Sequence, residues 1–290
     1  MQSATSFYDP VDDTHRHGLL EKYIAFLNHR NGQLDLKTGT LPRREESLNQ
    51  MNASKLRFRG QIDQRIFSQL NTSFSSSVPG LTPEMLLLLA FCKINAGEAY
   101  GVRVIKPVYQ QRLKGKTSLK DQVVIFAQEE EEYHTRILVG AARYFDIQVE
   151  DAYAPKLALK VLIHSMVYTP KSLFHPILFG AEVSGIYMFN WLMRQIKTLI
   201  TDQPELVEAL EERLIDIMID EVGHIAFNRL VMGEQGRQLG RFLAGQIVQT
   251  LPRMTMELNA MDFDPTKARD FLEFDYLSLP EEVRRRSFFA

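Results

Sequence analysis

The chain carries a Glu-x-x-His motif twice, each time within a segment of helical periodicity. The first motif is Glu131–His134, inside the amphipathic stretch Ile125–Asp146, and the second is Glu221–His224. Because residues three apart share one face of a helix, each motif presents a carboxylate and an imidazole side by side. A further acid directly precedes each motif, Glu130 in the first and Asp220 in the second. Two such pairs predict a metal site that draws on more than one helix.

Two lone acids in apolar helical segments complete the set. Glu98 follows the run Leu86–Cys92, and Glu182 lies within the segment 176–189. A carboxylate is rarely buried without a partner, because leaving water is costly for a charged group. The spacings, 131 − 98 = 33 and 221 − 182 = 39 residues, each allow one helix to end and a second to return antiparallel. The predicted metal ligands are therefore Glu98, Glu131, His134, Glu182, Glu221 and His224.

This order of ligands resembles that of the ferritin-like di-iron carboxylate proteins, in which a Glu from each of two helices and a Glu-x-x-His from each of the other two point into a four-helix bundle. The resemblance covers about residues 81–235. It implies an all-α fold, a ferritin-like four-helix bundle with additional flanking helices. It also implies one iron held by Glu98, Glu131 and His134, and a second held by Glu182, Glu221 and His224, with Glu131 and Glu221 as the bridges.

The resemblance also gives the acid before each motif a partner in the other motif. It implies that Asp220 reaches His134 and that Glu130 reaches His224, which would orient each imidazole. Carboxylates with one imidazole per metal suit iron or manganese better than copper or structural zinc. The expected cofactor is a pair of iron ions, Fe2+ or Fe3+, with manganese or a mixed manganese–iron pair as alternatives.

Within this superfamily, the chain looks most like the p-aminobenzoate N-oxygenase-like proteins, which are soluble, similar in length and carry extra helices around the bundle. Those proteins place a third histidine one turn before the last glutamate, where this chain has Ile217. The departure weakens the case for N-oxygenation and leaves C–H hydroxylation, desaturation and aldehyde deformylation open. The resemblance implies an oxygen-activating non-haem di-iron oxygenase or oxidase. Its substrates would be O2 and a small or medium organic molecule, and its electron donor ferredoxin or a similar reductase.

Two other functions of the superfamily stay open. A ferroxidase or iron-storage role is disfavoured by the long segments before residue 81 and after residue 235, because ferritins are little more than one bundle. A radical-generating di-metal subunit, as in ribonucleotide reductase, calls for a tyrosine one turn from an iron ligand and a C-terminal docking tail. Tyr133 lies inside the first motif, and the end Phe288–Ala290 is only faintly suggestive of such a tail.

Composition sets the remaining bounds. The chain has 290 residues, of which 45% are hydrophobic and 24% charged, with a formal net charge of −2, which gives no global case for nucleic-acid binding. Cys92 is the only cysteine, so no internal disulfide can form. We see no signal-peptide pattern, and no apolar run reaches the ~18–20 residues of a membrane span. We therefore expect a cytoplasmic protein without nucleic-acid or membrane partners, and a homodimer because dimers are the commonest oligomers.

Helical periodicity divides the chain into three segments. Residues 1–80 form an N-terminal extension with short helices at 17–29 and 58–70 and a loop at 30–53. Residues 81–235 form the bundle, with helices at 82–113, 118–145, 157–167 resuming at 177–200, and 204–233. Residues 236–290 hold a helix at 240–258 and an irregular tail with a solvated basic run at 284–286. Prolines are expected to kink or break the chain within these helical segments, at Pro107, Pro170 and Pro176.

Small residues gather beside the predicted ligands, namely Gly97, Gly101, Ala181, Gly185 and Gly223. A glycine inside a helix costs about 1 kcal/mol relative to alanine, so either space for a substrate or close helix packing accounts for them. Apolar side chains near the site could line a cavity, namely Tyr100, Phe126, Phe179, Ile186, Tyr187 and Phe227. The other histidines are expected to serve structure or surface, namely His15, His17, His29, His164 and His175.

Overall fold

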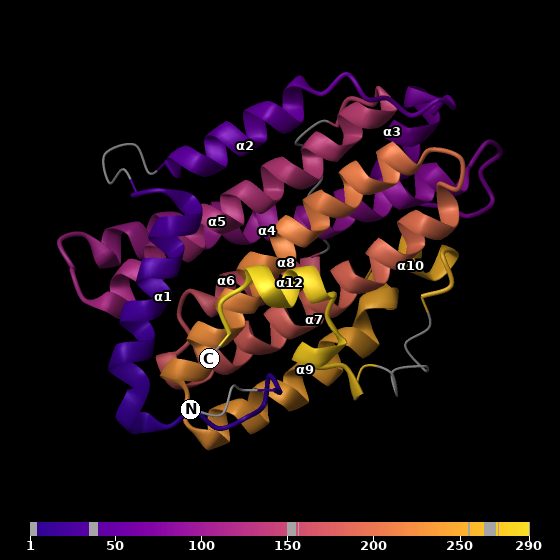
Figure 1. The fold of residues 1–290 in the computed structure, drawn as a ribbon. Helices are drawn as coiled ribbons and strands as arrows, with labels where there is room; N and C mark the ends of the chain where they lie inside the picture. Colours follow the sequence, from indigo (N-terminus) through magenta and orange to yellow (C-terminus); the bar gives the residue numbers. More distant parts are fainter. Residues whose placement is uncertain are drawn as a thin grey trace.

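The structure of the chain, a computed structural model, describes residues 5–34, 40–149, 155, 157–254, 256–263, 271 and 273–289. These residues form helices and no strand, which confirms the all-α prediction (Figure 1). The α-helices are α1 (Arg16–Asn31), α2 (Pro42–Ala53), α3 (Gln64–Thr72), α4 (Pro83–Leu113), α5 (Leu119–Ala141), α6 (Leu157–Met166), α7 (Lys171–Leu199), α8 (Pro204–Val231), α9 (Glu234–Met254), α10 (Met256–Ala260) and α12 (Glu281–Arg286). Short 3-10 turns are η1 (Asp13–His15), η2 (Ala142–Phe145) and η4 (Tyr276–Ser278).

The four long helices α4, α5, α7 and α8 form the centre of the molecule. Their starts carry local signals: the Thr82 side chain accepts a hydrogen bond from the N–H of Met85 before α4, and Ser118 accepts one from Asp121 before α5. The contacts run in a closed ring, α4 with α5, α5 with α8, α8 with α7, and α7 with α4. In Figure 1 these helices run side by side along the length of the molecule. Side chains from all four helices therefore meet on a common axis.

The remaining helices cover this ring. Helix α9 lies along α7, and α1 and α2 pack on α5, while α1 and α12 also reach α8. Helix α6 packs on α4, as do α3 and α10. One hydrophobic core takes in Leu20 from the first predicted segment, Leu88 and Ile217 from the second, and Val283 from the third. The flanking segments thus share the core of the central helices.

The N-terminal segment holds more helix than the sequence predicted. The stretch 30–53, predicted as a loop, contains the end of α1 and all of α2. This helix escapes a periodicity argument because Arg44 is one of its two buried residues. The helix predicted at 58–70 begins only at Gln64, where the Asp63 side chain accepts two backbone N–H groups as an N-cap.

Prolines interrupt the helices less than predicted. Helix α6 ends before Pro170 as expected, but α7 begins at Lys171 and continues through Pro176. The N–H that Pro176 lacks would have bonded to the carbonyl of Ser172, and Ser172 lies on an exposed first turn where water can replace it. Pro107 lies inside a continuous α4, so a break at that position was a wrong prediction.

The C-terminal tail is also more ordered than predicted. The segment 259–290, predicted as irregular, contains α12, and Val283 of that helix is fully buried. Arg286 forms ion pairs of 2.9 Å with Glu212 on α8 and with Glu282. The basic run 284–286 therefore ties the tail to the central helices at one of its three positions.

One helix has membrane-like composition. By length and hydropathy alone α4 could cross a membrane, which the search for unbroken apolar runs had not predicted; it is the one such helix among the described residues. Of its most apolar window, 56% is buried inside the structure. Its place in the central ring accounts for that composition.

Candidate metal centre

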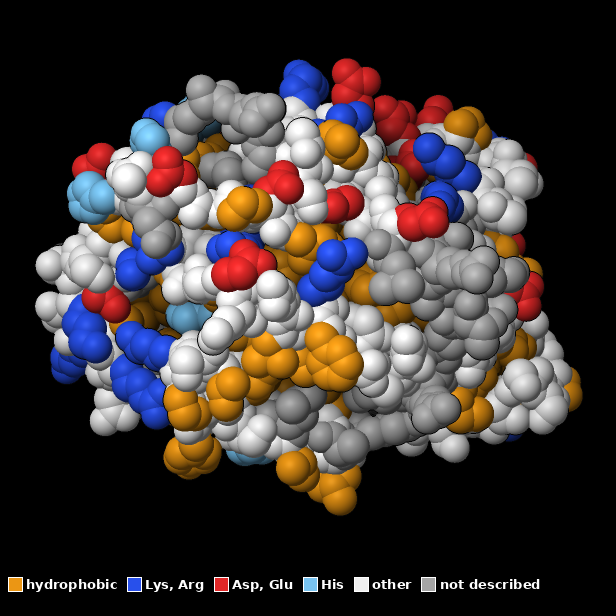
Figure 2. Space-filling view, turned by 90° about the horizontal axis from the view of Figure 1, so that it is seen from below, with side chains coloured by type: hydrophobic (Ala, Val, Ile, Leu, Met, Phe, Trp, Pro, Cys, Tyr) orange, Lys and Arg blue, Asp and Glu red, His pale blue; other side chains and the backbone are white. Residues whose placement is uncertain are grey.

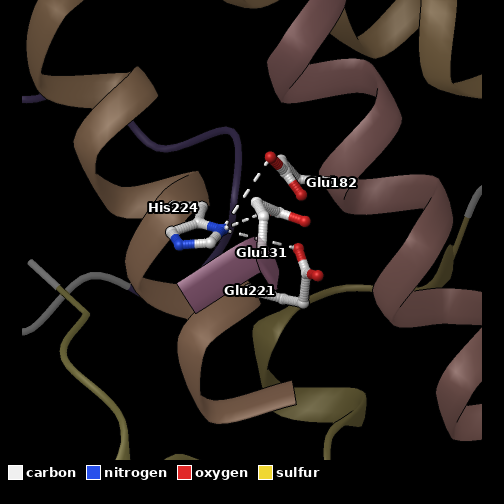
Figure 3. A group of neighbouring side chains, drawn as sticks. All are labelled: Glu131, Glu182, Glu221 and His224. Atoms are coloured by element: carbon white, nitrogen blue, oxygen red, sulfur yellow. Dashed lines mark ion pairs between the residues drawn. The ribbon is translucent and has the colours of Figure 1, made fainter. Parts of the chain in front are cut away.

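All six predicted ligands lie together on the inner faces of the four long helices. Glu98 comes from α4, the first motif from α5, Glu182 from α7 and the second motif from α8. Two groups of possible ligands have donor atoms within 4.8 Å of one another: Glu131, Glu182, Glu221 and His224 in one, and Glu98, Glu131 and His134 in the other. Figure 3 shows the first group, with the three carboxylates turned toward one ring nitrogen of His224. We call these six side chains the metal centre.

Glu131 and Glu221 each face both imidazoles. His134 Nδ1 lies 3.7 Å from Glu131 Oε2 and 3.3 Å from Glu221 Oε1. His224 Nδ1 lies 3.1 Å from Glu131 Oε1 and 3.8 Å from Glu221 Oε2. Each of these two carboxylates therefore turns one oxygen to each half of the centre, which is the position expected of a bridge. Glu182 faces only His224, at 3.9 Å.

The crossed pairing of acids and imidazoles is present. Asp220 Oδ2 lies 3.1 Å from His134 Nε2, and Glu130 Oε2 lies 3.1 Å from His224 Nε2. A carboxylate on Nε2 keeps a proton on that nitrogen, and Nδ1 is the ring atom that faces the centre. The acid that precedes each motif thus orients the imidazole of the other motif.

Several buried atoms of the centre have no hydrogen bond. Within the described part of the chain these are the Nδ1 atoms of His134 and His224, Oε2 of Glu98 and Oε2 of Glu221. Buried polar atoms nearly always have a partner, because an unpaired one costs about 1–3 kcal/mol. A cation bound between them would be that partner, and a set of oxygen donors with one imidazole per metal fits iron or manganese.

The protonation of the centre also indicates a place for positive charge. Burial raises the pKa of the Glu98 and Glu182 carboxyls well above its ordinary value. Burial acts on Glu131 in the same direction, but the imidazoles of His134 and His224 beside it hold its pKa below the ordinary value. Burial would lower the pKa of both imidazoles, but their hydrogen bonds to the surrounding carboxylates raise it well above the ordinary value. Without a metal, these groups bind protons, and a bound cation would take the place of those protons.

Two arginines that the sequence analysis missed support Asp220. Arg30 Nε donates to Asp220 Oδ1 at 2.6 Å, and Arg30 Nη2 donates to Asp216 Oδ1 at 2.9 Å. Arg44 Nη1 donates to Asp216 Oδ2 at 2.7 Å, and its Nη2 donates to Asp220. Burial would raise the pKa of Asp220, but the two guanidinium groups and His134 hold it well below the ordinary value. Asp220 is thus fixed as an anion by charges brought from α1 and α2.

Glu130 has a different support, which was also missed. Asn31, the last residue of α1, donates from Nδ2 to Glu130 Oε1 at 2.6 Å. Both side chains are fully buried. The acid that orients His224 is therefore hydrogen-bonded to a neutral amide. The acid that orients His134 is hydrogen-bonded to two cations.

A cavity of about 330 Å³ adjoins the centre, and Glu98, Glu131, Glu182, Glu221 and His224 form part of its wall. Most of its other lining side chains are apolar. Four of the five small residues singled out in the sequence line it, namely Gly97, Gly101, Ala181 and Gly185. A Cβ added at Gly101 or Gly185 would meet nothing within 4 Å. These two glycines therefore keep space open rather than allow close packing.

The glycine at position 223 serves close packing and does not keep space open. A Cβ at Gly223 would lie 3.0 Å from Cε2 of Tyr23 and closer still to its hydroxyl. Tyr23 is buried against the outer side of α8 at this point. Of the six apolar side chains expected near a cavity, Phe227 lines it, and the other five, Tyr100, Phe126, Phe179, Ile186 and Tyr187, are not part of its wall.

His175 and Tyr133 differ from their expected roles. His175, expected to be structural, lines the cavity, and its Nδ1 lies 2.9 Å from Asn228 Oδ1. Burial lowers the pKa of His175. Tyr133 is directed away from the centre, because its hydroxyl donates to the carbonyl of Leu41 at 3.3 Å. A redox role for Tyr133 thus loses its geometric basis.

Comparisons with protein-family models, with curated proteins and with solved structures gave no match. The case for a function of this chain therefore rests on the metal centre and the cavity beside it.

Proposed function

We propose that this chain is an oxygen-activating di-iron oxidoreductase with a ferritin-like four-helix bundle, acting on an apolar organic substrate of small or medium size. One observation carries the proposal. Six donor side chains from four helices converge beside an apolar cavity, and four of their buried donor atoms have no hydrogen-bond partner within the described residues. Metal ions bound by such a set of residues would reduce dioxygen and couple that reduction to the oxidation of a substrate.

The residues of the chain have distinct proposed tasks. Glu131 and Glu221, which face both imidazoles, would span the two metal positions. Asp220 and Glu130 keep a proton on Nε2 of the imidazoles, so that Nδ1 remains the donor. A reduced ferredoxin or similar reductase remains the proposed source of electrons.

The cavity indicates the class of substrate. Its apolar walls favour a hydrocarbon part of the substrate. Asn228 donates from Nδ2 to the carbonyl of His224 at 3.0 Å, so its Oδ1 faces His175 and accepts the Nδ1 proton of that ring. The neutral His175 then has a free lone pair on Nε2. We infer that this nitrogen accepts a hydrogen bond from a hydroxyl or amide group of the substrate.

Metal loading tests the proposal directly. The metal-free chain would be loaded with Fe(II) under nitrogen, its metal content measured, and its oxygen uptake then followed with a reductant and a series of apolar substrates. We expect two irons per chain and substrate-dependent oxygen uptake. Glu131→Ala and His224→Ala should lose iron while keeping their helical circular dichroism.

Glu132→Gln is the matched control. Glu132 is the neighbour of Glu131 on the same helix, but its side chain is 46% exposed and pairs with Lys106 outside the centre. This variant should load iron normally. Uptake of many irons per chain would favour storage instead. A wild-type chain that binds neither iron nor manganese would refute the metal centre.

A further inference from the structure

Helix α6 is apolar on two opposite faces. Its inner residues Leu159, Ile163 and Met166 line the cavity. On the outer side, Leu157 is 76% exposed and Val161 is 60% exposed. An apolar face of a helix normally packs against other parts of a protein or lies in a lipid phase. The outer face of α6 is therefore built for contact with something other than water.

The exposed stripe continues beyond the end of α6. Tyr168, in the turn after the helix, is 83% exposed, and Leu173 in the first turn of α7 is also exposed. Leu157, Val161 and Tyr168 are spaced by four and seven residues, so the first two share one helix face and the turn extends it. In Figure 2, hydrophobic side chains stand out along the lower edge of the molecule. We call Leu157, Val161, Tyr168 and Leu173 the α6 surface.

Basic residues lie on and next to this surface. Residues 99–128 contain six Lys or Arg and one acid, and residues 155–181 contain three Lys and no acid, in a chain whose net charge is −2. Lys160 lies on α6 itself, Lys171 falls between Tyr168 and Leu173, and Arg112 donates to the carbonyl of Val167 at 3.1 Å. Within the described ranges, no ion pair joins Lys160, Lys171 or Arg112 to a carboxylate. Figure 2 also shows Lys and Arg side chains gathered beside the hydrophobic edge.

We propose that the α6 surface binds a membrane whose headgroups are anionic. Exposed apolar side chains would enter the boundary between headgroups and acyl chains, with Tyr168 at the level where tyrosine is enriched. The surrounding lysines and arginines would meet the anionic headgroups. No helix needs to cross the bilayer, since α4 is already used by the central ring. A surface of this kind contains no spanning segment, and the proposal replaces the expectation of no membrane partner.

A second copy of the chain fits this surface less well. In a two-fold dimer the same patch meets itself, so each basic residue around the stripe would face the basic residues of the other copy. Such a contact would bring like charges together, which opposes association. An anionic surface matches both the apolar stripe and its basic surroundings.

The surface lies on the other side of the helix that lines the cavity. A membrane-bound chain would hold its cavity against the bilayer, within reach of apolar molecules dissolved there. This consequence alone rests on the proposed function, whereas membrane binding requires neither metal nor activity.

Vesicle sedimentation tests the proposal with the full chain. Wild-type protein would be mixed with vesicles of phosphatidylcholine alone or of phosphatidylcholine with phosphatidylglycerol. We expect sedimentation with the anionic vesicles, weakening as salt rises. Leu157→Glu/Val161→Glu should abolish it, and Lys171→Glu should lower the partition coefficient about fivefold or more. Phe242→Glu is the matched control, because Phe242 is a 61% exposed aromatic residue on α9 and is not part of the α6 surface.

The outcomes separate the alternatives. Selective loss of binding in the α6 and Lys171 variants, with unchanged thermal unfolding and with Phe242→Glu like wild type, supports the proposal. Absence of binding to anionic vesicles overturns it, as does an equal loss in Phe242→Glu. Sedimentation velocity adds one more test: a dimer that Leu157→Glu/Val161→Glu dissociates would mean that a second copy covers the surface, and the proposal would fall.

Discussion

The His134 half of the metal centre and the His224 half present the same kinds of donor, yet the chain supports them by different means. In the His134 half, Asp220 and Asp216 are held by Arg30 and Arg44, so two buried acids face two buried cations. In the His224 half, Glu130 is held by the neutral amide of Asn31. The acids behind His134 are thus hydrogen-bonded to two cations, while the acid behind His224 is hydrogen-bonded to a neutral amide and interacts with Arg30 only through space.

The halves also differ at the residue before each histidine. Tyr133 precedes His134 and sends its hydroxyl outward to the carbonyl of Leu41. Gly223 precedes His224 and leaves the room that Tyr23 of α1 occupies. Equivalent positions of the two motifs therefore serve opposite needs in packing, one filling space and the other making it. Repetition of a ligand motif does not extend to the residues that support it.

The largest expected effect separates the two supporting acids. Asp220→Asn leaves Arg30 and Arg44 buried with one carboxylate between them, which should cost about 3–5 kcal/mol of the free energy of unfolding, as for a broken buried ion pair. Glu130→Gln keeps an oxygen that accepts the Asn31 hydrogen bond and should cost about 1 kcal/mol. Urea unfolding of the two metal-free variants measures both values. Equal losses would show that the arginines do not distinguish the halves.

The meeting of the six candidate ligands could be predicted because their signal in the sequence is local. The spacing of Glu131 to His134 puts both on one helix face whatever the rest of the chain does, and the isolation of Glu98 among apolar residues marks it as unusual. Both of these inferences use only neighbours in sequence. The crossed partner of His134 has a different origin, because only the resemblance to the ferritin-like di-iron carboxylate proteins implied that Asp220 reaches that imidazole.

The residues that hydrogen-bond Asp220 and Glu130 could not be identified from their neighbours in sequence. Arg44 lies in a polar stretch, Pro42–Ala53, that resembles a solvated loop, and nothing nearby shows that its charge is buried against Asp216, 172 residues away. Arg30 and Asn31 stand at the end of a helix, where polar residues are ordinary. This burial of charge cannot be recognised until the helix that carries the arginine is docked on the helix that carries the acid. The exposure of Val161 was hidden for the same reason, because an apolar residue in a helix is usually expected to face a core.

A second test removes one support from each half and measures metal binding. Arg44→Met and Asn31→Ala should each weaken one of two iron equivalents by about 10–100-fold, because groups that orient a ligand's partner tune affinity on that scale. The double variant should weaken both equivalents. Stepwise anaerobic titration with Fe(II) measures each step. Arg136→Met is the control, since Arg136 pairs with Glu45 at a position where the two side chains are 40% and 32% exposed. Equal weakening of both equivalents by Arg44→Met alone would mean that the halves act as one unit.

The smallest expected effects lie where the halves are alike. Gly101 follows Glu98 by three residues and Gly185 follows Glu182 by three, and each faces open cavity. Alanine at either position should raise the free energy of unfolding by up to about 1 kcal/mol, because the added methyl meets no neighbour and alanine favours helix. Gly223→Ala should instead destabilise by about 1–3 kcal/mol, since its methyl meets Tyr23. Urea unfolding of the three variants shows whether each glycine leaves space for a ligand or makes room for a neighbouring side chain. If Gly101→Ala and Gly185→Ala were as costly as Gly223→Ala, the cavity would be closed in solution. If they are stabilising, the chain forgoes that stability at the same place in both halves, which is expected only where a molecule must fit beside both metal positions.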